Sequence, residues 1–365
     1  MKTKLRDLLF PQQKSKIKAG EGKQEGKYKF FTSSPVQNKH IDVANYTKPA
    51  LIFGTGGNAS VHFCNEPFST STDCLVMFGR NEQELQTIYF FLRNNMHLLE
   101  GGFKGAGLKH ISKEYILDLS IELPSSTVQQ ELLQKASSIE SMVAKRKEQL
   151  AKLDTLVKSR FIELFGDPKS NSFNWKQEKL SSTMEVRGRV GWKGYKKEDL
   201  RNSGPLVLGA THLSDDGRID LSEPVFLSEE KYFESPEIMV KQNDLIFAQR
   251  GSLGKVGLVE TEYKAATINP CVLILRPIKI NSQFARYYLM IQKDNGELDK
   301  LNSGSTIPMI TQKSIGEFSV TVPPIELQNQ FADFVKQTDK SKFEIQKSLE
   351  KLEILKKALM QQYFG

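Results

Sequence analysis

Leu119-Ser120-Ile121-Glu122-Leu123-Pro124 recurs 199 positions later as Phe318-Ser319-Val320-Thr321-Val322-Pro323, and this recurrence is the main evidence for the domain organisation that the sequence predicts. The match runs without a gap over residues 107–166 and 306–365. There, 12 of 60 aligned pairs are identical, and apolar and chain-breaking positions stay in register. Self-similarity of this kind marks two copies of one structural unit. The 365 residues are enough for two regions with cores of their own. We therefore predict a globular region and a helix, followed by a second globular region and a second helix.

The segments that follow the repeated proline have the pattern of long helices. Thr127–Leu164 contains no Gly or Pro, and an apolar stripe runs along it: Ile139, Val143, Leu150, Leu153, Val157 and Leu164. The equivalent stripe of the second copy is Ile345, Leu349, Leu352 and Leu359, interrupted by Lys342 and Lys356. Because neither helix has a core of its own, we expect the two to pack together as an antiparallel coiled coil. At about 1.5 Å per residue each is roughly 55 Å long. Gly166-Asp167-Pro168 ends the first one.

The globular regions read as mixed α/β and rich in strands. Short apolar runs such as Leu245-Ile246-Phe247-Ala248 are bounded by Gly, Pro, Asn or Asp, which favours strands. Phe284 to Ile291 has helical spacing. The predicted fold class is α+β, with four consecutive parts: a first globular domain with a basic N-terminal arm, a central long helix, a second globular domain and a C-terminal long helix. Their predicted bounds are residues 1–125, 126–165, 166–325 and 326–365.

Charge and composition narrow the class of protein. A net charge of +8 points to an anionic partner. Residues 1–30 carry nine basic side chains against three acidic ones. We expect them to form a mobile basic arm, and either a solvated tail or an arm that contacts phosphates remains open. The three cysteines and five histidines show neither a disulfide framework nor metal-ligand spacing. Without an apolar run near 18 residues or a signal peptide, we expect a soluble, cytoplasmic protein.

Motifs for catalysis fail on inspection. Gly54-Thr55-Gly56-Gly57 follows a strand, but the next residues look like another strand rather than the helix that a dinucleotide site requires, so a glycine-rich hairpin is favoured. Gly251-Ser252-Leu253-Gly254-Lys255-Val256 is too short for a phosphate-binding P-loop and has Val in place of Ser or Thr. Asn269-Pro270 is followed by Cys271 and Val272, which does not make the strand end of an adenine methyltransferase. The sequence therefore predicts no catalytic residue and no metal site.

What remains is a set of basic, glycine-rich turns that are matched between the two copies. Glycine lets a backbone approach DNA closely, and Arg and Gln can bond in a bidentate manner to guanine and adenine. The alternative is a set of ordinary solvated turns. The predicted DNA-binding residues are Thr55, Asn58, Lys104, Lys109, Arg187, Arg189, Lys193, Tyr195, Gln249, Arg250, Ser252, Lys255, Ser305 and Thr306.

These features together resemble the specificity subunits of Type I restriction-modification systems. The resemblance covers nearly the whole chain from about residue 40. It rests on the duplicated unit, on the helix that ends Lys158 to Pro168, and on signature turns in both copies. In the second copy these are Gly191-Trp192-Lys193-Gly194-Tyr195, Gly209-Ala210-Thr211-His212, Gly251 to Gly257 and Ser303 to Pro308. In the first copy they are Gly54 to Ser60 and Phe68 to Cys74.

The resemblance implies a division of labour among subunits. Each domain would read one half of a split DNA target, and the helix pair would set the distance between the halves. Two modification subunits would use S-adenosylmethionine to methylate adenine. Two restriction subunits would add ATP- and Mg-dependent translocation and cleavage, so this chain would bind no cofactor itself. The competing hypotheses are a non-catalytic coiled-coil scaffold with an incidental basic surface and a self-contained DNA enzyme.

Overall fold

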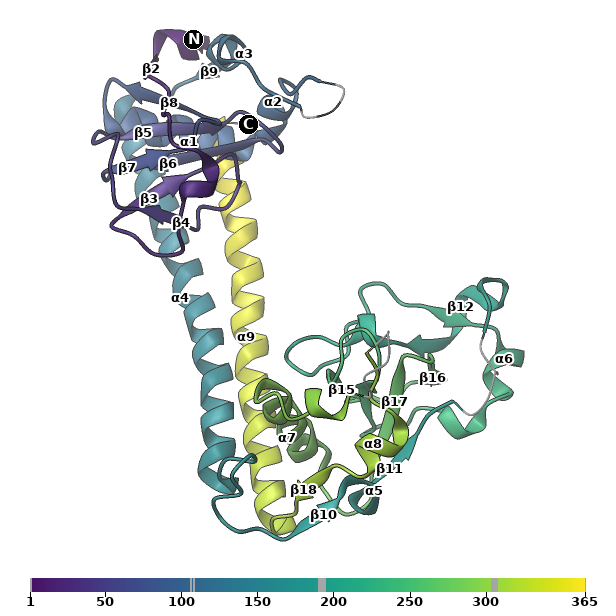
Figure 1. Ribbon diagram of the computed structural model, residues 1–365. Helices are drawn as coiled ribbons and strands as arrows, with labels where there is room; N and C mark the ends of the chain where they lie inside the picture. Colours follow the sequence, from purple (N-terminus) through teal and green to yellow (C-terminus); the bar gives the residue numbers. More distant parts are fainter. Residues whose placement is uncertain (1, 106, 108, 190–194, 303–307, 365) are drawn as a thin grey trace. The chain divides into compact units, whose positions relative to one another are not determined.

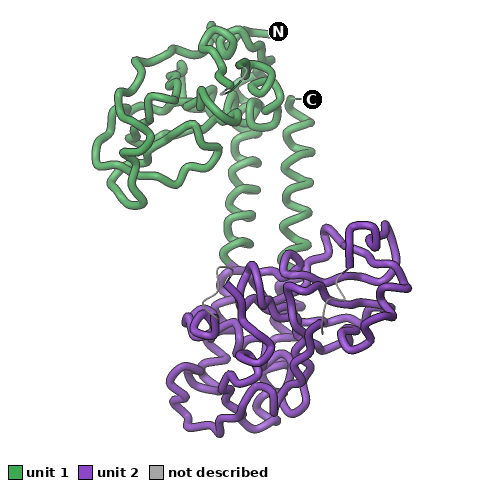
Figure 2. The backbone as a smooth tube through the Cα atoms, turned by 45° about the vertical axis from the view of Figure 1, so that its right-hand side comes forward, with its two compact units in different colours: residues 1–148, 345–365 green, residues 149–344 purple. Residues whose placement is uncertain are grey.

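The structure, a computed structural model, describes residues 2–105, 107, 109–189, 195–302 and 308–364. The chain divides into two compact units, which Figure 2 shows in different colours. The first unit comprises residues 1–148 and 345–365, and the second comprises residues 149–344. Each unit therefore contains one globular domain together with parts of both long helices.

The first unit is built from short strands around a buried central strand (Figure 1). In its described residues the sheets have the orders β2-β8-β5-β6, β4-β3-β7 and β1-β9. The strands are β1 (Lys2–Lys4), β2 (Leu9–Pro11), β3 (Tyr28–Phe31), β4 (Lys39–Ile41), β5 (Ala50–Gly54), β6 (Ser60–Cys64), β7 (Phe68–Thr70), β8 (Cys74–Gly79) and β9 (Ser120–Glu122). The shorter helices are α1 (Glu82–Asn94), α2 (Met96–Glu100) and α3 (Lys113–Asp118). All five residues of β5 are buried, as expected of a continuous apolar strand between two neighbours.

The second unit repeats this topology strand for strand. Its described sheets have the orders β11-β17-β14-β15, β13-β12-β16 and β10-β18. The strands are β10 (Gln177–Lys179), β11 (Met184–Arg187), β12 (Leu200–Leu208), β13 (Phe226–Leu227), β14 (Leu245–Ala248), β15 (Val256–Leu258), β16 (Ala266–Ile268), β17 (Val272–Pro277) and β18 (Ser319–Thr321). The shorter helices are α5 (Leu180–Thr183), α6 (Glu229–Phe233), α7 (Ser282–Asp294) and α8 (Gln312–Gly316). In both units the three-stranded sheet contains one parallel pair, β3 with β7 and β12 with β16. The predicted helix over Phe284 to Ile291 is confirmed as part of α7.

Two long helices complete the fold, α4 (Ser126–Phe165) and α9 (Ile325–Phe364). In the first unit Lys356 Nζ of α9 lies 2.9 Å from Glu140 Oε1 of α4. In the second unit Lys342 Nζ lies 2.5 Å from Asp154 Oδ1. The later residue of α4, Asp154, pairs with the earlier residue of α9, Lys342, so the two helices run antiparallel. The two lysines that interrupt the predicted apolar stripe thus pair with acids of the facing helix. The predicted α+β class and the packed helix pair are confirmed.

The N-terminal segment differs from the expected mobile arm. Residues 2–4 pair with β9, residues 9–11 pair with β8, and residues 28–31 form a strand of the three-stranded sheet. Burial explains why these residues pair with the sheets, since Leu5, Leu9 and Phe30 are at most 1% exposed. The expectation of a mobile arm is wrong, because buried apolar residues among the lysines anchor the segment.

Two further features follow from the described residues. No helix among them is long and apolar enough to cross a membrane. No group of three or more His, Cys, Asp or Glu side chains in the described ranges is arranged to hold a metal ion.

Candidate nucleic-acid interface

The glycine turn of the first unit is a hairpin between β5 and β6. Gly54 pairs with Ser60 across the two antiparallel strands, and Gly57 has a φ of +79°. The prediction of a glycine-rich hairpin, rather than a nucleotide-binding loop, is therefore confirmed. Thr55 is buried, and its hydroxyl donates a hydrogen bond of 2.9 Å to the carbonyl oxygen of Asp73. Its side chain fixes the turn and leaves Asn58 as the exposed polar side chain beside it.

A second loop of the first unit lies directly against this turn. The backbone N–H of Gly57 donates to the carbonyl oxygen of Lys109 over 3.3 Å, and that of Ile111 donates to Thr55 over 3.1 Å. His110 pairs with both Gly56 and Lys104 through backbone bridges. The side chains of Lys104, Lys109 and Asn58 are all exposed. Four predicted site residues from two distant segments are thus brought together at one edge of the first unit.

The second unit repeats this pairing of loops. Its glycine turn joins β14 to β15, with Gly251 at a φ of +74°. The backbone N–H of Ile310 donates to the carbonyl oxygen of Gln249 over 3.0 Å, and Arg250 forms a backbone bridge with Met309. Since Ile310 is the repeat equivalent of Ile111, the same two loops meet in both units.

The side chains at the second turn differ from those at the first. Arg250 is exposed, and its Nε lies 3.0 Å from Met309 Sδ. Gln249 donates through Nε2 to the carbonyl oxygen of Pro270 over 2.9 Å, while Ser252 is exposed. The exposed guanidinium and hydroxyl can donate to phosphate or base acceptors.

Three other predicted residues of the second unit are engaged within their own domain. Arg187 donates through Nη1 to the carbonyl oxygen of Glu237 and pairs with Glu185 at 2.7 Å. Arg189 donates through Nε to the carbonyl oxygen of Ile268, and its guanidinium lies 5.6 Å from the Tyr195 ring centroid. Burial lowers the pKa of Arg189 and raises that of Tyr195. These contacts hold β11, Arg189 and Tyr195 against the rest of the domain.

Lys255 lies at the end of the turn rather than at its tip. Its Nζ is 2.7 Å from Asp215 Oδ1, and the side chain lines a cavity of about 290 Å³ together with Lys158 and Lys293. The remaining predicted residues, Lys193, Ser305 and Thr306, lie outside the described residues.

Two residues at the first turn were not predicted from the sequence. Ser33 Oγ donates to the carbonyl oxygen of Asp73 over 2.6 Å and accepts from the N–H of Gly56 over 3.3 Å. His110 donates through Nδ1 to the carbonyl oxygen of Thr55 over 3.1 Å. For Ser33 the available signal was the strand-like, aromatic-rich stretch Tyr28–Phe31 just before it, since it marks a strand that leads into this turn.

Comparisons with known proteins agree with this architecture. The chain matches the family described as Type I restriction modification DNA specificity domain over residues 1–154 and 192–356. It is 24% identical over 345 residues to the Type I restriction enzyme MjaVIII specificity subunit of Methanocaldococcus jannaschii, a match that covers 89% of this chain and 80% of the relative.

Solved structures of the same kind share the fold. The S subunit of a Type I restriction-modification system from M. genitalium superposes with a TM-score of 0.66 at 17% identity, covering 100% of this chain and 96% of that one. A chain from a structure of the complex assembly and conformational transition of a type I R-M system gives a TM-score of 0.57 at 14% identity, covering 100% and 97%. With the family match spanning most of the sequence, the chain belongs to the Type I restriction-modification DNA specificity family, whose members are non-catalytic subunits that determine the DNA target.

Proposed function

We propose that each unit reads one half of a split DNA target through its glycine turn and the loop that pairs with it. The observation that carries the proposal is the recurrence of this loop pair: Thr55 with Ile111 in the first unit and Gln249 with Ile310 in the second. The backbone frame is the same while the exposed side chains differ. Asn58, Lys104 and Lys109 stand at one turn, and Arg250 and Ser252 stand at the other. One frame with two sets of side chains suits the reading of two different half-sites.

The residues divide into two expected roles. Lys104 and Lys109 are point charges that suit phosphates, whereas Arg250 and Asn58 offer the geometry for guanine and adenine edges. Replacement of a phosphate contact weakens binding to all sequences equally, and replacement of a base contact relaxes one position of the target. Arg187, Arg189 and Tyr195 would support the reading loops from within the domain rather than touch DNA.

The partners follow from the duplication. We propose that one chain docks two modification subunits, one at each helix, and that these carry the S-adenosylmethionine chemistry in the cytoplasm. Leu156 of α4 and Leu355 of α9 are identical repeat equivalents, and their side chains are 48% and 53% exposed. An exposed leucine at the same place in both copies suits the same apolar surface of two identical partners. Two restriction subunits with ATP and Mg would join this complex.

A domain exchange tests the proposal. The chain is co-expressed with a modification subunit of its own system, methylated adenines are mapped across the host DNA, and the purified complex is weighed by native mass spectrometry. We expect one split motif and a mass with two modification subunits. Exchange of residues 167–325 for the corresponding domain of a relative should change only one half of the motif. A change in both halves or in neither contradicts modular reading, and methylation that persists without this chain favours the coiled-coil scaffold.

A further inference from the structure

Two cavities, one in each unit, occupy equivalent places in the repeat. In the first unit a cavity of about 320 Å³ lies where α1 faces the helix pair, and its wall includes Arg93 of α1 and Lys357 of α9. In the second unit a cavity of about 290 Å³ has Lys293 of α7 and Lys158 of α4 in its wall. Lys357 is the repeat equivalent of Lys158, at the offset of 199 positions.

The short helices α1 and α7 are also equivalent in the two units. α1 spans Glu82–Asn94 and is capped by Asn81, whereas α7 spans Ser282–Asp294 and is capped by Asn281. The two helices therefore match at an offset of 200 positions, which places Arg93 on Lys293. Each cavity thus has one cation of the domain helix and one repeat-equivalent lysine of a long helix in its wall. The wall of the first also includes Lys356, Glu140 and Glu353 of the long helices, and that of the second includes Lys255, Asp215 and Asp294.

The long-helix cation is one of the few exposed features that the repeat keeps. Only 12 of 60 aligned pairs are identical, and several of them, such as Gln129 with Gln328, are buried and satisfy packing or hydrogen bonds. Lys158 and Lys357 are identical and exposed. Packing of the helices does not require a lysine there, so a shared ligand is the simpler explanation.

The charge of the second cavity is incompletely compensated. Lys158 Nζ pairs with Asp294 at 2.8 Å, and Lys255 Nζ pairs with Asp215 at 2.7 Å. Within the described residues no carboxylate lies at ion-pair distance from Lys293. Burial, followed by the neighbouring Lys255, lowers the pKa of Lys293, while Asp215, Asp294 and Asp299 act on it in the opposite direction. An ammonium group has three N–H donors, so the two paired lysines also keep donors for an anion.

Helical geometry separates this cation from the exposed leucine. Lys158 and Leu156 are two residues apart, as are Lys357 and Leu355, which at 3.6 residues per turn places them about 200° apart around the helix axis. A protein partner that covers the leucine face therefore leaves the lysine face open. The wall of the second cavity also contains Gly254 and Lys255, the last residues of the glycine turn. The cavity therefore borders the glycine turn at the end that leads into β15.

We infer that each cavity binds one phosphate of the DNA backbone in the spacer between the two half-sites, with Lys158 and Lys293 as its donors in the second unit and Arg93 and Lys357 in the first. The inference rests on the proposed function. A spacer whose sequence is not read needs contacts that fix position without touching bases, and phosphate contacts do this. These four side chains would hold the DNA in register between the two reading loops.

The slope of binding against salt tests the inference. Complexes with the modification subunit carry Lys158→Gln with Lys293→Gln, or Arg93→Gln with Lys357→Gln, and bind a duplex that contains the mapped motif or one of equal length that lacks it. Each released phosphate contact makes the plot of log K against log salt shallower by about 0.9, and both pairs together by about twice that. The loss should be equal on both duplexes, and the methylated motif should not change. Lys158→Arg with Lys293→Arg should restore the slope.

A matched control and a neutral backbone locate the contact. Lys300→Gln removes one charge from the same unit outside the cavity, where the 67% exposed lysine pairs with Glu297, and it should leave the slope unchanged. Duplexes with a single methylphosphonate are walked across the spacer. At one position the loss of affinity caused by the neutral linkage and the loss caused by the Lys158/Lys293 substitutions should not add. This result identifies the bound group as a backbone phosphate rather than a free anion. An unchanged slope overturns the inference while specific binding still supports the proposed function. Loss of modification subunits at an unchanged slope would assign the cavities to a partner's acidic side chain.

Discussion

The two units have sheets of the same topology, but the contacts that hold each domain against the long helices differ. In the first unit the domain packs on the long helices through an apolar cluster, formed by Phe90, Leu132, Ala136, Ile139, Leu359 and Met360. In the second unit four phenylalanine rings pack together, with Phe161 centred 4.9 Å from Phe165, 5.5 Å from Phe284 and 5.3 Å from Phe331. Phe161 and Phe331 stand where the first unit has Met360 and Leu132, whereas Phe165 is matched by another phenylalanine, Phe364.

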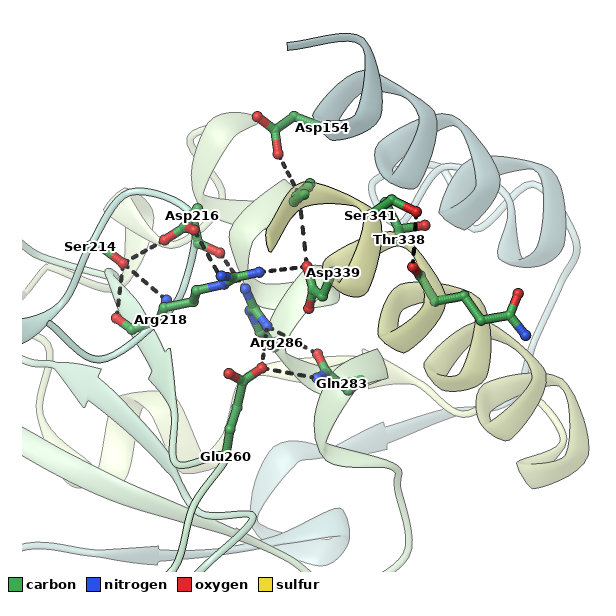
Figure 3. Close-up of polar contacts among 12 residues, drawn as sticks. Asp154, Ser214, Asp216, Arg218, Glu260, Gln283, Arg286, Thr338, Asp339 and Ser341 are labelled. Atoms are coloured by element: carbon green, nitrogen blue, oxygen red, sulfur yellow. Dashed lines mark hydrogen bonds and ion pairs between the residues drawn. The ribbon is translucent and has the colours of Figure 1, made fainter. Parts of the chain in front are cut away.

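The second unit adds a network of charges between its domain and α9 (Figure 3). Arg218 Nη2 lies 2.5 Å from Asp339 Oδ1 of α9. Arg286, only 1% exposed, donates to the carbonyl oxygen of Asp216 over 2.6 Å and faces Glu260 at 3.4 Å. In the first unit the equivalent of Asp339 is Glu140, which pairs with Lys356 of the facing helix instead. One topology thus tolerates an apolar or an ionic attachment, because the sheets and the helix pair carry the fold.

The largest expected difference between the units is the loss of stability when a residue of the apolar or the aromatic cluster is truncated. Phe161 and Met360 are repeat equivalents and are 0% and 3% exposed. Phe161→Ala should destabilise the second unit by about 3–5 kcal/mol and Met360→Ala the first by about 2 kcal/mol, because a ring removed from among three others leaves the larger cavity. Both tryptophans, Trp175 and Trp192, belong to the second unit. In urea, tryptophan fluorescence should therefore shift for Phe161→Ala and stay unchanged for Met360→Ala. An equal shift for both would mean that the long helices unfold the two units as one.

A smaller difference is expected at the ion pairs. Asp339→Ala removes the partner of Arg218, and the Asp339 side chain is only 19% exposed. We expect a loss of about 1–2 kcal/mol, because a partly buried guanidinium loses a charged hydrogen bond. Glu140→Ala breaks a pair whose side chains are 47% and 35% exposed and should cost less than about 0.5 kcal/mol. Hydrogen exchange of α7 and of α1 reports the two effects separately. Equal protection in both variants would show that the network adds nothing to the attachment.

Sequence patterns found those parts of the molecule that repeat over many residues. The long helices were predictable because one apolar stripe persists over some forty positions. β1 and β2 were not, because each has three residues and pairs with a strand far away in the sequence. The turns at Asn58 and Arg250 were found through glycine and charge. The contacts of Arg187 with Glu237, of Arg189 with Ile268 and of Lys255 with Asp215 could not be predicted, since each joins residues 40 or more positions apart.

Alkaline pH should produce the smallest difference between the units. Burial raises the pKa of the Cys74 thiol in the first unit from 9.0 to about 11, and that of the Tyr287 hydroxyl in the second from 10.0 to about 12. Because the folded state holds each proton more tightly than the unfolded chain does, the stability that each group contributes is complete below its ordinary pKa. It is lost as the pH rises through the raised value.

The first unit should therefore begin to lose stability near pH 9 and the second near pH 10. Cys74→Ala should remove the loss between pH 9 and about 11, as measured by hydrogen exchange of β8. Tyr287→Phe should remove that between pH 10 and about 12, as measured by tryptophan fluorescence in urea. Each variant serves as the control for the other, since each changes one unit only. A Tyr287→Phe protein with the same alkaline loss as the parent would mean that the hydroxyl ionises in a site already open to water. The buried aromatic attachment of the second unit would then be looser than the contacts of Phe161 and Phe331 indicate.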